Sequence, residues 1–301
     1  MLRFKKLSHL ALNVSDLDRS AAFYRDLVGL DLVERTADTA FLSCDADHYN
    51  LSLHAAAQPS LKRIAFELES AAQLPVAREV LERAGVRHRR LAAGECADLR
   101  VEEGMRLVDP NGITLDLLVG MRQRTEAFTP HPLRLLRLSH AVIRVPDFAQ
   151  SLRFYTEVMN FRVSDFRHED AGDPYFAFMR CFPNPFHHSF AIQQSKAPAF
   201  FHSAYSVDSL DDLMAGRNRL LEEGVIVAPT PGRHKASGSV FQYFADPDGF
   251  TVEFTLGMEE FPEAGPRQPR RLDKSYRTTD IWNGPKPVNL PNLGAIEPAT
   301  V

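Results

Sequence analysis

The 301-residue chain lacks three features that would each point to a class of protein. Its three cysteines, Cys44, Cys96 and Cys181, form no Cys-x-x-Cys spacing, which argues against a disulfide framework and favours reduced thiols in a cytoplasm. No apolar run reaches transmembrane length, and the first residues, MLRFKK, lack the apolar core of a signal peptide. A net charge of −4 gives no reason to expect a nucleic acid or an anionic membrane as a partner.

The chain does contain an internal repeat. Residues 7–24 (LSHLALNVSDLDRSAAFY) and 138–155 (LSHAVIRVPDFAQSLRFY) share their Leu-Ser-His start, an Asp and their Phe-Tyr end. Later, DPNGITLDLL at 109–118 matches DPDGFTVEFT at 246–255. We therefore predict a duplicated domain over residues 1–122 and 136–257, joined by a polar linker, 123–135, that contains two prolines.

Each half divides again into a strand, a helix and further short strands. The first helix is expected to start at a capping Ser15 and to end at Gly29. Alternating apolar residues predict strands in the first half at 7–14, 30–35, 39–44, 50–55 and 63–69, with a second helix over 73–84. The second half predicts strands at 137–145, 161–167, 175–181, 187–193, 200–206, 240–245 and 250–256, one more near 226, and helices at 147–158 and 208–223. The pattern is that of an α+β protein with four βαβββ units.

The stretch at 232–254, GRHKASGSVFQYFADPDGFTVEF, concentrates chemically active side chains. It predicts two strands joined by a tight turn and carries His234, Tyr243 and Glu253 in order: a base, a phenol and a carboxylate. Glu253 stands among apolar neighbours, where a carboxylate is rare unless it is paired or bound to a metal. An isolated Glu would more often lie on an edge strand and face water.

Four βαβββ units with Asp-Pro-x-Gly turns resemble the vicinal-oxygen-chelate superfamily, over about residues 5–257. The resemblance implies two tandem domains, each curled into a half-open barrel around a pocket. Within that superfamily the second half is similar to the type I extradiol ring-cleavage dioxygenases. Their pattern implies iron(II) held by His140, His202 and Glu253, since two imidazoles and one carboxylate on one face are typical of non-haem iron(II) oxygenases.

The same resemblance implies three catalytic groups that are not metal ligands. His188 takes the acid–base role, with His187 as the adjacent candidate, because alternation along a strand lets only one of the two face inward. His234 and Tyr243 contact the bound diol. The sequence departs from the family pattern at Gln242, where an apolar residue is usual.

Residues two positions from these groups on the same strand face are expected to shape the pocket. They are Val142, Phe186 and Ala204, which suggest an apolar slot for a planar ring. No basic cluster is evident in the sequence that would require an anionic substituent on that ring. Cys181 stands close before His188, which leaves open that it lies near the site.

The first half departs from the ligand pattern at one position. The residues equivalent to the three ligands are His9, Arg63 and Asp116. An arginine stays protonated and cannot bind a cation, so the first domain is expected to be metal-free, with Arg63 paired to Asp116.

The activity implied is insertion of both atoms of O2 into a catechol-type aromatic diol, which gives a ring-opened product of the muconic semialdehyde type. A homo-oligomer in the cytoplasm, without nucleic acid or membrane as partner, is expected. One alternative is another metal enzyme of the superfamily (glyoxalase, epimerase or thiol transferase), which commonly uses four protein ligands. A second is a non-enzymatic binding protein of the bleomycin-resistance type, which lacks the three ligands.

The tail, 258–301, is rich in proline and contains the single tryptophan, Trp282. We expect an extended segment that lies over the second domain, with Ile281 and Trp282 as its apolar anchors.

Overall fold

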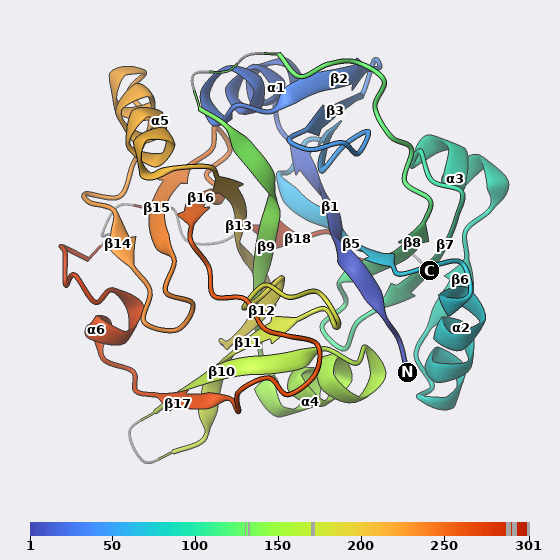
Figure 1. Cartoon of the computed structure of the whole chain (residues 1–301). Helices are drawn as coiled ribbons and strands as arrows, with labels where there is room; N and C mark the ends of the chain where they lie inside the picture. The colour runs from blue at the N-terminus through green and yellow to red at the C-terminus, as the bar shows by residue number, and fades with distance from the viewer. Residues whose placement is uncertain (130, 132, 170–171, 287–289, 291–293, 300–301) are drawn as a thin grey trace.

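The computed structural model describes residues 1–129, 131, 133–169, 172–286, 290 and 294–299 (Figure 1). Four βαβββ units follow one another, as predicted. The first contains β1 (Phe4–Val14), α1 (Leu17–Phe23), the π-helical turn η1 (Tyr24–Val28), β2 (Asp31–Arg35), β3 (Thr39–Ser43) and β4 (Leu51–Ala55). The second contains β5 (Ser60–Leu68), α2 (Gln73–Arg83), β6 (His88–Arg90), α3 (Ala93–Asp98), β7 (Glu103–Val108) and β8 (Thr114–Val119).

The second half repeats this order. Its first unit contains β9 (Leu135–Val145), α4 (Phe148–Arg153), the π-helical turn η2 (Phe154–Val158), β10 (Arg162–His168), β11 (Pro174–Arg180) and β12 (Phe190–Gln194). The last unit contains β13 (Ala199–Val207), α5 (Leu210–Glu222), β14 (Gly232–Arg233), β15 (Val240–Ala245) and β16 (Thr251–Leu256). The tail adds β17 (Arg270–Leu272), α6 (Tyr276–Thr279) and β18 (Ala295–Ile296).

Two units share each sheet. The first sheet has the order β2-β3-β4-β1-β5-β8-β7-β6, and the second β14-β15-β16-β13-β9-β12-β11-β10-β17. Antiparallel pairs, β1 with β5 and β9 with β13, join the units. Figure 1 shows β1 and β9 near the middle of the molecule and the helices toward its periphery. No helix in the described part of the chain is long and apolar enough to cross a membrane.

One apolar core runs through both halves. The aromatic rings of Phe4 and Phe66 from the first sheet pack edge-on against Phe161, with centroids 5.3 and 5.0 Å apart. Phe66 also meets Phe190 of β12 at 5.9 Å. The two halves therefore bury their apolar faces against each other.

The repeated sequence motifs also join the halves. Tyr24, at the end of the first repeated motif, donates a hydrogen bond to Asp246 in the turn of the other half, at 3.0 Å. Its counterpart Tyr155 donates to Asp109, at 2.8 Å. All four residues are buried. The Phe-Tyr and Asp-Pro-x-Gly motifs thus form two equivalent cross-links between the halves.

The first helix begins one residue later than predicted. Its N-cap is Asp16, whose carboxylate accepts from the Arg19 backbone N–H at 3.0 Å. Ser15, the predicted cap, instead donates its backbone N–H to Asp248 at 2.9 Å and its hydroxyl to the same carboxylate. Ser15 was the wrong choice because a contact from the other half, invisible in local sequence, takes its side chain.

The tail lies over both halves of the protein. β17 pairs with β10 of the second sheet, and β18 pairs with β5 of the first. The prediction of its anchors was wrong, because the side chains of Ile281 and Trp282 are 45% and 50% exposed. Leu272 and Thr278 are buried instead. Strand pairing, polar contacts and the buried side chains of Phe261 and Leu272 hold this segment.

Candidate metal centre and pocket

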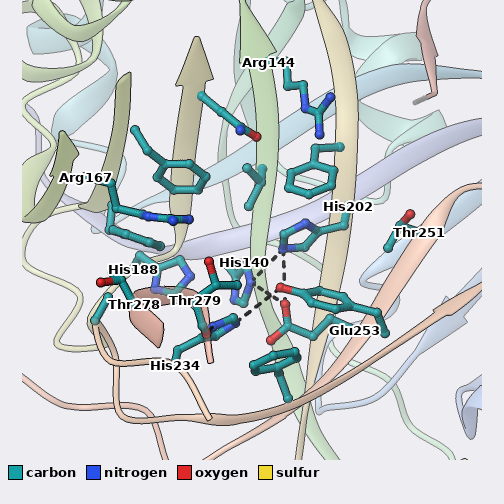
Figure 2. A pocket seen from close by; sticks show the side chains of 18 of the residues that line it. His140, Arg144, Arg167, His188, His202, His234, Thr251, Glu253, Thr278 and Thr279 are labelled. Carbon is teal, nitrogen blue, oxygen red and sulfur yellow. Dashed lines mark hydrogen bonds and ion pairs between the residues drawn. The ribbon is translucent and has the colours of Figure 1, made fainter. Parts of the chain in front are cut away.

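Three neighbouring strands bring together the three side chains predicted as metal ligands. His140 lies on β9, His202 on β13 and Glu253 on β16. The two Nε2 atoms are 3.2 Å apart. Glu253 Oε2 lies 3.3 Å from His140 Nε2 and 3.2 Å from His202 Nε2 (Figure 2). The potential ligand atoms of the three predicted residues therefore lie close together on one face of the sheet.

This geometry fits a divalent cation. For ligand bonds of about 2.1 Å, two ligands at a right angle are separated by about 3.0 Å and at a tetrahedral angle by about 3.4 Å. The observed separations, 3.2 to 3.3 Å, lie between these limits. Glu253 is fully buried and neither of its oxygens has a well-formed hydrogen bond. A buried carboxylate without such partners is costly, and a cation among the three atoms would remove that cost.

Electrostatics favours the ligand forms of these groups. Burial lowers the pKa of His140 to about 4, although Glu253 opposes the shift. Burial alone would raise the pKa of Glu253, but the neighbouring His140 and His202 outweigh it and hold that pKa below its usual range. Both groups are therefore deprotonated at neutral pH, as cation binding requires.

His188 lines the pocket and His187 does not, although both residues precede β12 and lie outside the strand that was predicted over 187–193. The His188 ring lies 4.2 Å from that of His140, between centroids. Its Nδ1 is 3.0 Å from Nδ1 of His187, whose Nε2 lies 2.8 Å from Asp165. Nε2 of His188 is left for a ligand. Burial, together with the neighbouring histidines, lowers the pKa of His188 well below its ordinary value.

Asp165, His187 and Glu259 also bring possible metal ligands close together. Arg267 of the tail binds Asp165 with both terminal nitrogens, at 2.9 and 3.0 Å, and Glu259 at 2.7 Å. Arg270 adds a contact to Asp165 at 2.6 Å. Because these arginines already neutralise the carboxylates, the cluster is an ion-pair network behind His188 rather than a second metal site.

His234 and Tyr243 lie beside the three ligands, with the Tyr243 hydroxyl 3.3 Å from Nε2 of His234. His234 Nδ1 donates to the backbone carbonyl of Thr279 in the tail, at 2.6 Å. This bond leaves Nε2 as the nitrogen that faces the pocket. Burial and the nearby Glu253 raise the pKa of Tyr243 well above its ordinary value, so Tyr243 is a neutral phenol that can donate.

Of the three residues predicted to shape the pocket, Val142 lines it and two do not. Ala204 is fully buried between the strands of His140 and Glu253, which are its partners in register. Phe186 lies outside the pocket, where the Arg137 guanidinium covers its ring at 3.3 Å. The prediction for Ala204 was wrong because same-face spacing gives the side of the sheet but not the depth along it. The prediction for Phe186 was wrong because this residue precedes β12 and makes only an isolated bridge to Glu260.

The cavity has a volume of about 250 Å³ and is lined by residues that the sequence did not reveal. Phe176, Phe178 and Phe201 form its apolar wall. Phe201 and His202 are adjacent, yet both line the cavity because the register shifts at this point of β13. The other unforeseen lining residues include Arg144 and Arg167 from the sheet and Tyr276, Thr278 and Thr279 from the tail. Cys181 is buried and does not line the cavity.

The equivalent position in the first half holds ions of opposite charge. Asp116 accepts two hydrogen bonds from Arg106, both at 2.8 Å, and Arg63 Nε lies 3.3 Å from it. The Arg63–Asp116 pair is present as predicted, but Arg106, which was not foreseen, is the closer partner. His9 contacts the Tyr49 hydroxyl at 3.3 Å. Within the described residues, the first half has no cluster of metal-binding side chains.

Comparison with known proteins gives a consistent set of relatives. The profile of the Glyoxalase/Bleomycin resistance protein/Dioxygenase superfamily matches residues 6–117 and 137–254. An iron-dependent extradiol dioxygenase of Rhodococcus jostii is 27% identical over 271 residues, covering 84% of this chain and 89% of that protein. A manganese-dependent 2,3-dihydroxybiphenyl 1,2-dioxygenase of Geobacillus genomosp. 3 is 23% identical, covering 84% and 85%. The crystal structure of an Mn(II)-bound glyoxalase from Novosphingobium aromaticivorans has a TM-score of 0.86 at 28% identity, covering 98% and 97%.

Proposed function

The chain belongs to the Glyoxalase/Bleomycin resistance protein/Dioxygenase superfamily, and on that premise we propose that it is an extradiol ring-cleavage dioxygenase. Its substrates are a catechol-type aromatic diol and O2. The observation that carries this proposal is the convergence of His140, His202 and Glu253 at the end of a pocket that also holds His188, His234 and Tyr243. Relatives named as dioxygenases support it.

The ligand set separates this function from that of the four-ligand enzymes of the superfamily. Among the described residues, no fourth His, Cys, Asp or Glu joins the cluster of His140, His202 and Glu253. His140, His202 and Glu253 would hold a cation with three protein ligands, which would leave positions open for a diol and for O2, as in iron(II) oxygenases. When bound, the metal supplies the redox and Lewis-acid chemistry.

The chain's own residues supply binding, orientation and proton transfer. The phenol of Tyr243 and Nε2 of His234 hydrogen-bond the diol oxygens and favour loss of a diol proton. Nε2 of His188 takes up and returns a proton during ring opening, because burial keeps this imidazole neutral beforehand. Phe176, Phe178 and Phe201 orient the ring and exclude water. The product is a ring-opened acid of the muconic semialdehyde type.

We propose iron(II) as the native metal. The two-histidine, one-carboxylate set and the iron-dependent relative from Rhodococcus jostii support iron. Manganese is the competing choice, since two other relatives are named for it. Anaerobic reconstitution with each metal, followed by a rate measurement at equal occupancy, decides between them. The homo-oligomer and the cytoplasmic location stay predictions.

The function is tested by adding a panel of catechols to the iron-loaded protein in air and recording the visible absorbance of ring-opened product. Wild-type protein should turn over at least one catechol. The folded Glu253→Ala variant should turn over none, because it lacks the carboxylate that completes the metal site. If no catechol in a panel of monocyclic, alkylated, acidic and biaryl diols is opened, the proposal is wrong.

A further inference from the structure

We propose that the outer half of the pocket is an anion subsite in which Arg144 and Arg167 bind a carboxylate carried by the substrate. The substrate class is then catechols with an acidic side chain on the ring edge away from the two hydroxyls. This inference rests on the proposed function and names its substrate more closely. It also replaces the expectation from sequence, which found no basic cluster that would require an anion.

Strand β9 divides the pocket into three levels. His140, Val142 and Arg144 alternate along β9 and all line the cavity. At about 3.3 Å per residue, the Cα atoms of His140 and Arg144 are separated by about 13 Å. The metal ligands thus lie at one level, an apolar side chain at the next and a guanidinium at the third. A diol bound at the first level would direct its far ring edge toward the third.

Arg144 and Arg167 stand at the two ends of a row of four residues that are paired in register across neighbouring strands. Arg144 is opposite Gln193 of β12, Gln193 is opposite Phe176 of β11, and Phe176 is opposite Arg167 of β10. All four line the same cavity, although they come from four strands about 4.8 Å apart. The sheet therefore curls so that both ends of the row face one space. Figure 2 shows both guanidinium groups on the side of the pocket away from Glu253.

Neither guanidinium has an acidic partner among the residues that the structure describes. The Nε atoms of Arg144 and Arg167 are buried and make no hydrogen bond. Arg144 lies over the ring of Phe201 at 4.5 Å. Arg167 donates a long bond of 3.4 Å to the backbone carbonyl of Lys274 and lies 5.5 Å from the Tyr175 ring. Burial also lowers the pKa of Arg144, which reflects an uncompensated charge.

The charge balance of the pocket favours an anion. Glu253 is the sole carboxylate among the lining residues, and it belongs to the metal centre. A partly buried cation without a counter-ion carries a desolvation cost, whereas an arginine and a carboxylate form short, charge-assisted and often bidentate hydrogen bonds. A neutral catechol would leave both guanidinium groups unpaired. A catechol acid pairs them and completes the pocket.

The test compares substrates that differ in one charge. The probes are 3,4-dihydroxyphenylacetate and 3-(3,4-dihydroxyphenyl)propionate, each beside its methyl ester. For wild-type protein, kcat/KM for at least one acid should exceed that for its ester by about tenfold or more, which is the range for hydrogen bonds to charged groups. Arg144→Gln and Arg167→Gln should each lower this ratio, mainly by raising KM for the acid. Arg144→Lys should restore part of it, since Lys keeps the charge but not the planar fork.

Arg162→Gln is the matched control, because Arg162 is exposed on the same strand as Arg167 and lies outside the cavity. It should leave the acid-to-ester ratio unchanged. Anaerobic calorimetric titration of the same acids and esters into metal-loaded protein separates this inference from the proposed function. Tighter binding of an acid, lost in Arg144→Gln, supports the subsite even if no ring is opened. Ring opening with equal or better use of both esters overturns the subsite alone. Binding of neither acid also overturns the subsite, whereas the proposed function is overturned only if no catechol of the wider panel is opened.

Discussion

At the scale of single residues, the histidines of the pocket differ in what their second nitrogen contacts. Nδ1 of His188 faces His187, and Nδ1 of His234 faces the carbonyl of Thr279. In each ring the bond fixes the orientation and leaves Nε2 toward the cavity. This arrangement resembles the way hydrogen-bonded partners orient metal-ligating histidines. The orientation of these two rings is therefore determined by their hydrogen-bonded neighbours, since both residues lie outside the strands.

We predict that His188→Gln leaves metal content and catechol affinity close to wild type and lowers kcat by about 100-fold or more. Positioned proton transfer typically contributes about 10²- to 10⁴-fold, and His188 is not a metal ligand. Steady-state kinetics with metal analysis of the same samples checks this.

The control is His187→Gln, which should cause a smaller loss because His187 acts through His188. A larger loss in His187→Gln than in His188→Gln would move the acid–base role to His187. Full activity in both variants would assign proton transfer to another group.

The cluster of His140, His202 and Glu253 was predictable from sequence because the second half resembles a family whose pattern places these residue types on three strands. The rest of the wall was not. Phe201 faces the cavity through a local register shift, and Arg144 lies opposite Gln193 through pairing between strands distant in sequence. Neither feature leaves a local signal in the chain. Ala204 was misplaced for the related reason that strand spacing does not give depth in a pocket.

At the scale of elements, the tail is part of the site. The carbonyl of Thr279 orients His234, and Arg267 and Arg270 neutralise the buried Asp165 behind His187. Composition predicted that the tail lies over the protein but named Ile281 and Trp282 as its anchors. The actual contacts are strand pairs, hydrogen bonds and ion pairs with residues about 100 positions earlier, as between Arg270 and Asp165, which composition cannot reveal.

We predict that truncation after Met258 lowers both the melting temperature and kcat. The truncation leaves Asp165 buried without its two arginines and frees His234 from Thr279, and an uncompensated buried charge is strongly destabilising. Thermal unfolding and steady-state kinetics of the truncated protein check this. Trp282→Ala is the matched control and should change neither quantity much, because that side chain is half exposed. A truncated protein with wild-type stability and rate would show that the tail contributes neither to folding stability nor to catalysis.

At the scale of the whole molecule, the duplicated motifs join the halves, whereas the clusters of possible metal ligands found among the described residues lie in the second half and the tail. Tyr24 with Asp246, and Tyr155 with Asp109, cross the interface in equivalent ways. The repeat was visible in the sequence, but its partners across the interface were not, because each tyrosine meets the turn of the opposite half. In the first half, Arg63 and Arg106 form ion pairs with Asp116, so their guanidinium groups stand where a metal ion would bind.

We predict that the burial of Asp246 makes stability fall as pH rises. Burial raises the pKa of Asp246 from its ordinary value of 3.8 to about 7. The folded protein therefore holds this proton where the unfolded chain has lost it, so the contribution is full below about pH 4 and is lost as pH rises through about 7. The unfolding free energy of wild type relative to Asp246→Asn should drop by at most about 4 kcal/mol across that window. Denaturant titrations from pH 4 to pH 8 measure it, and a difference that rises or stays flat contradicts the assignment.

We also predict one tightly bound metal ion per chain. Asp116 is already paired with Arg106 and Arg63, so its carboxylate is not available as a ligand for a second metal ion. Elemental analysis after anaerobic reconstitution and desalting checks the stoichiometry, with His202→Ala as the variant expected to retain none. Two tightly bound ions per chain would contradict this view of the first half.

In the proposed reaction, both atoms of O2 enter an aromatic diol at the site of His140, His202 and Glu253. The most direct measurement is O2 uptake by metal-loaded protein supplied with a catechol that it consumes, with the mass of the product determined in parallel. We predict that O2 and catechol are consumed in equal molar amounts and that the product is heavier than the catechol by two oxygen atoms. The Glu253→Ala variant should consume neither O2 nor catechol. Consumption of the catechol without O2 uptake, or a product that has only lost hydrogen, would contradict the proposed reaction.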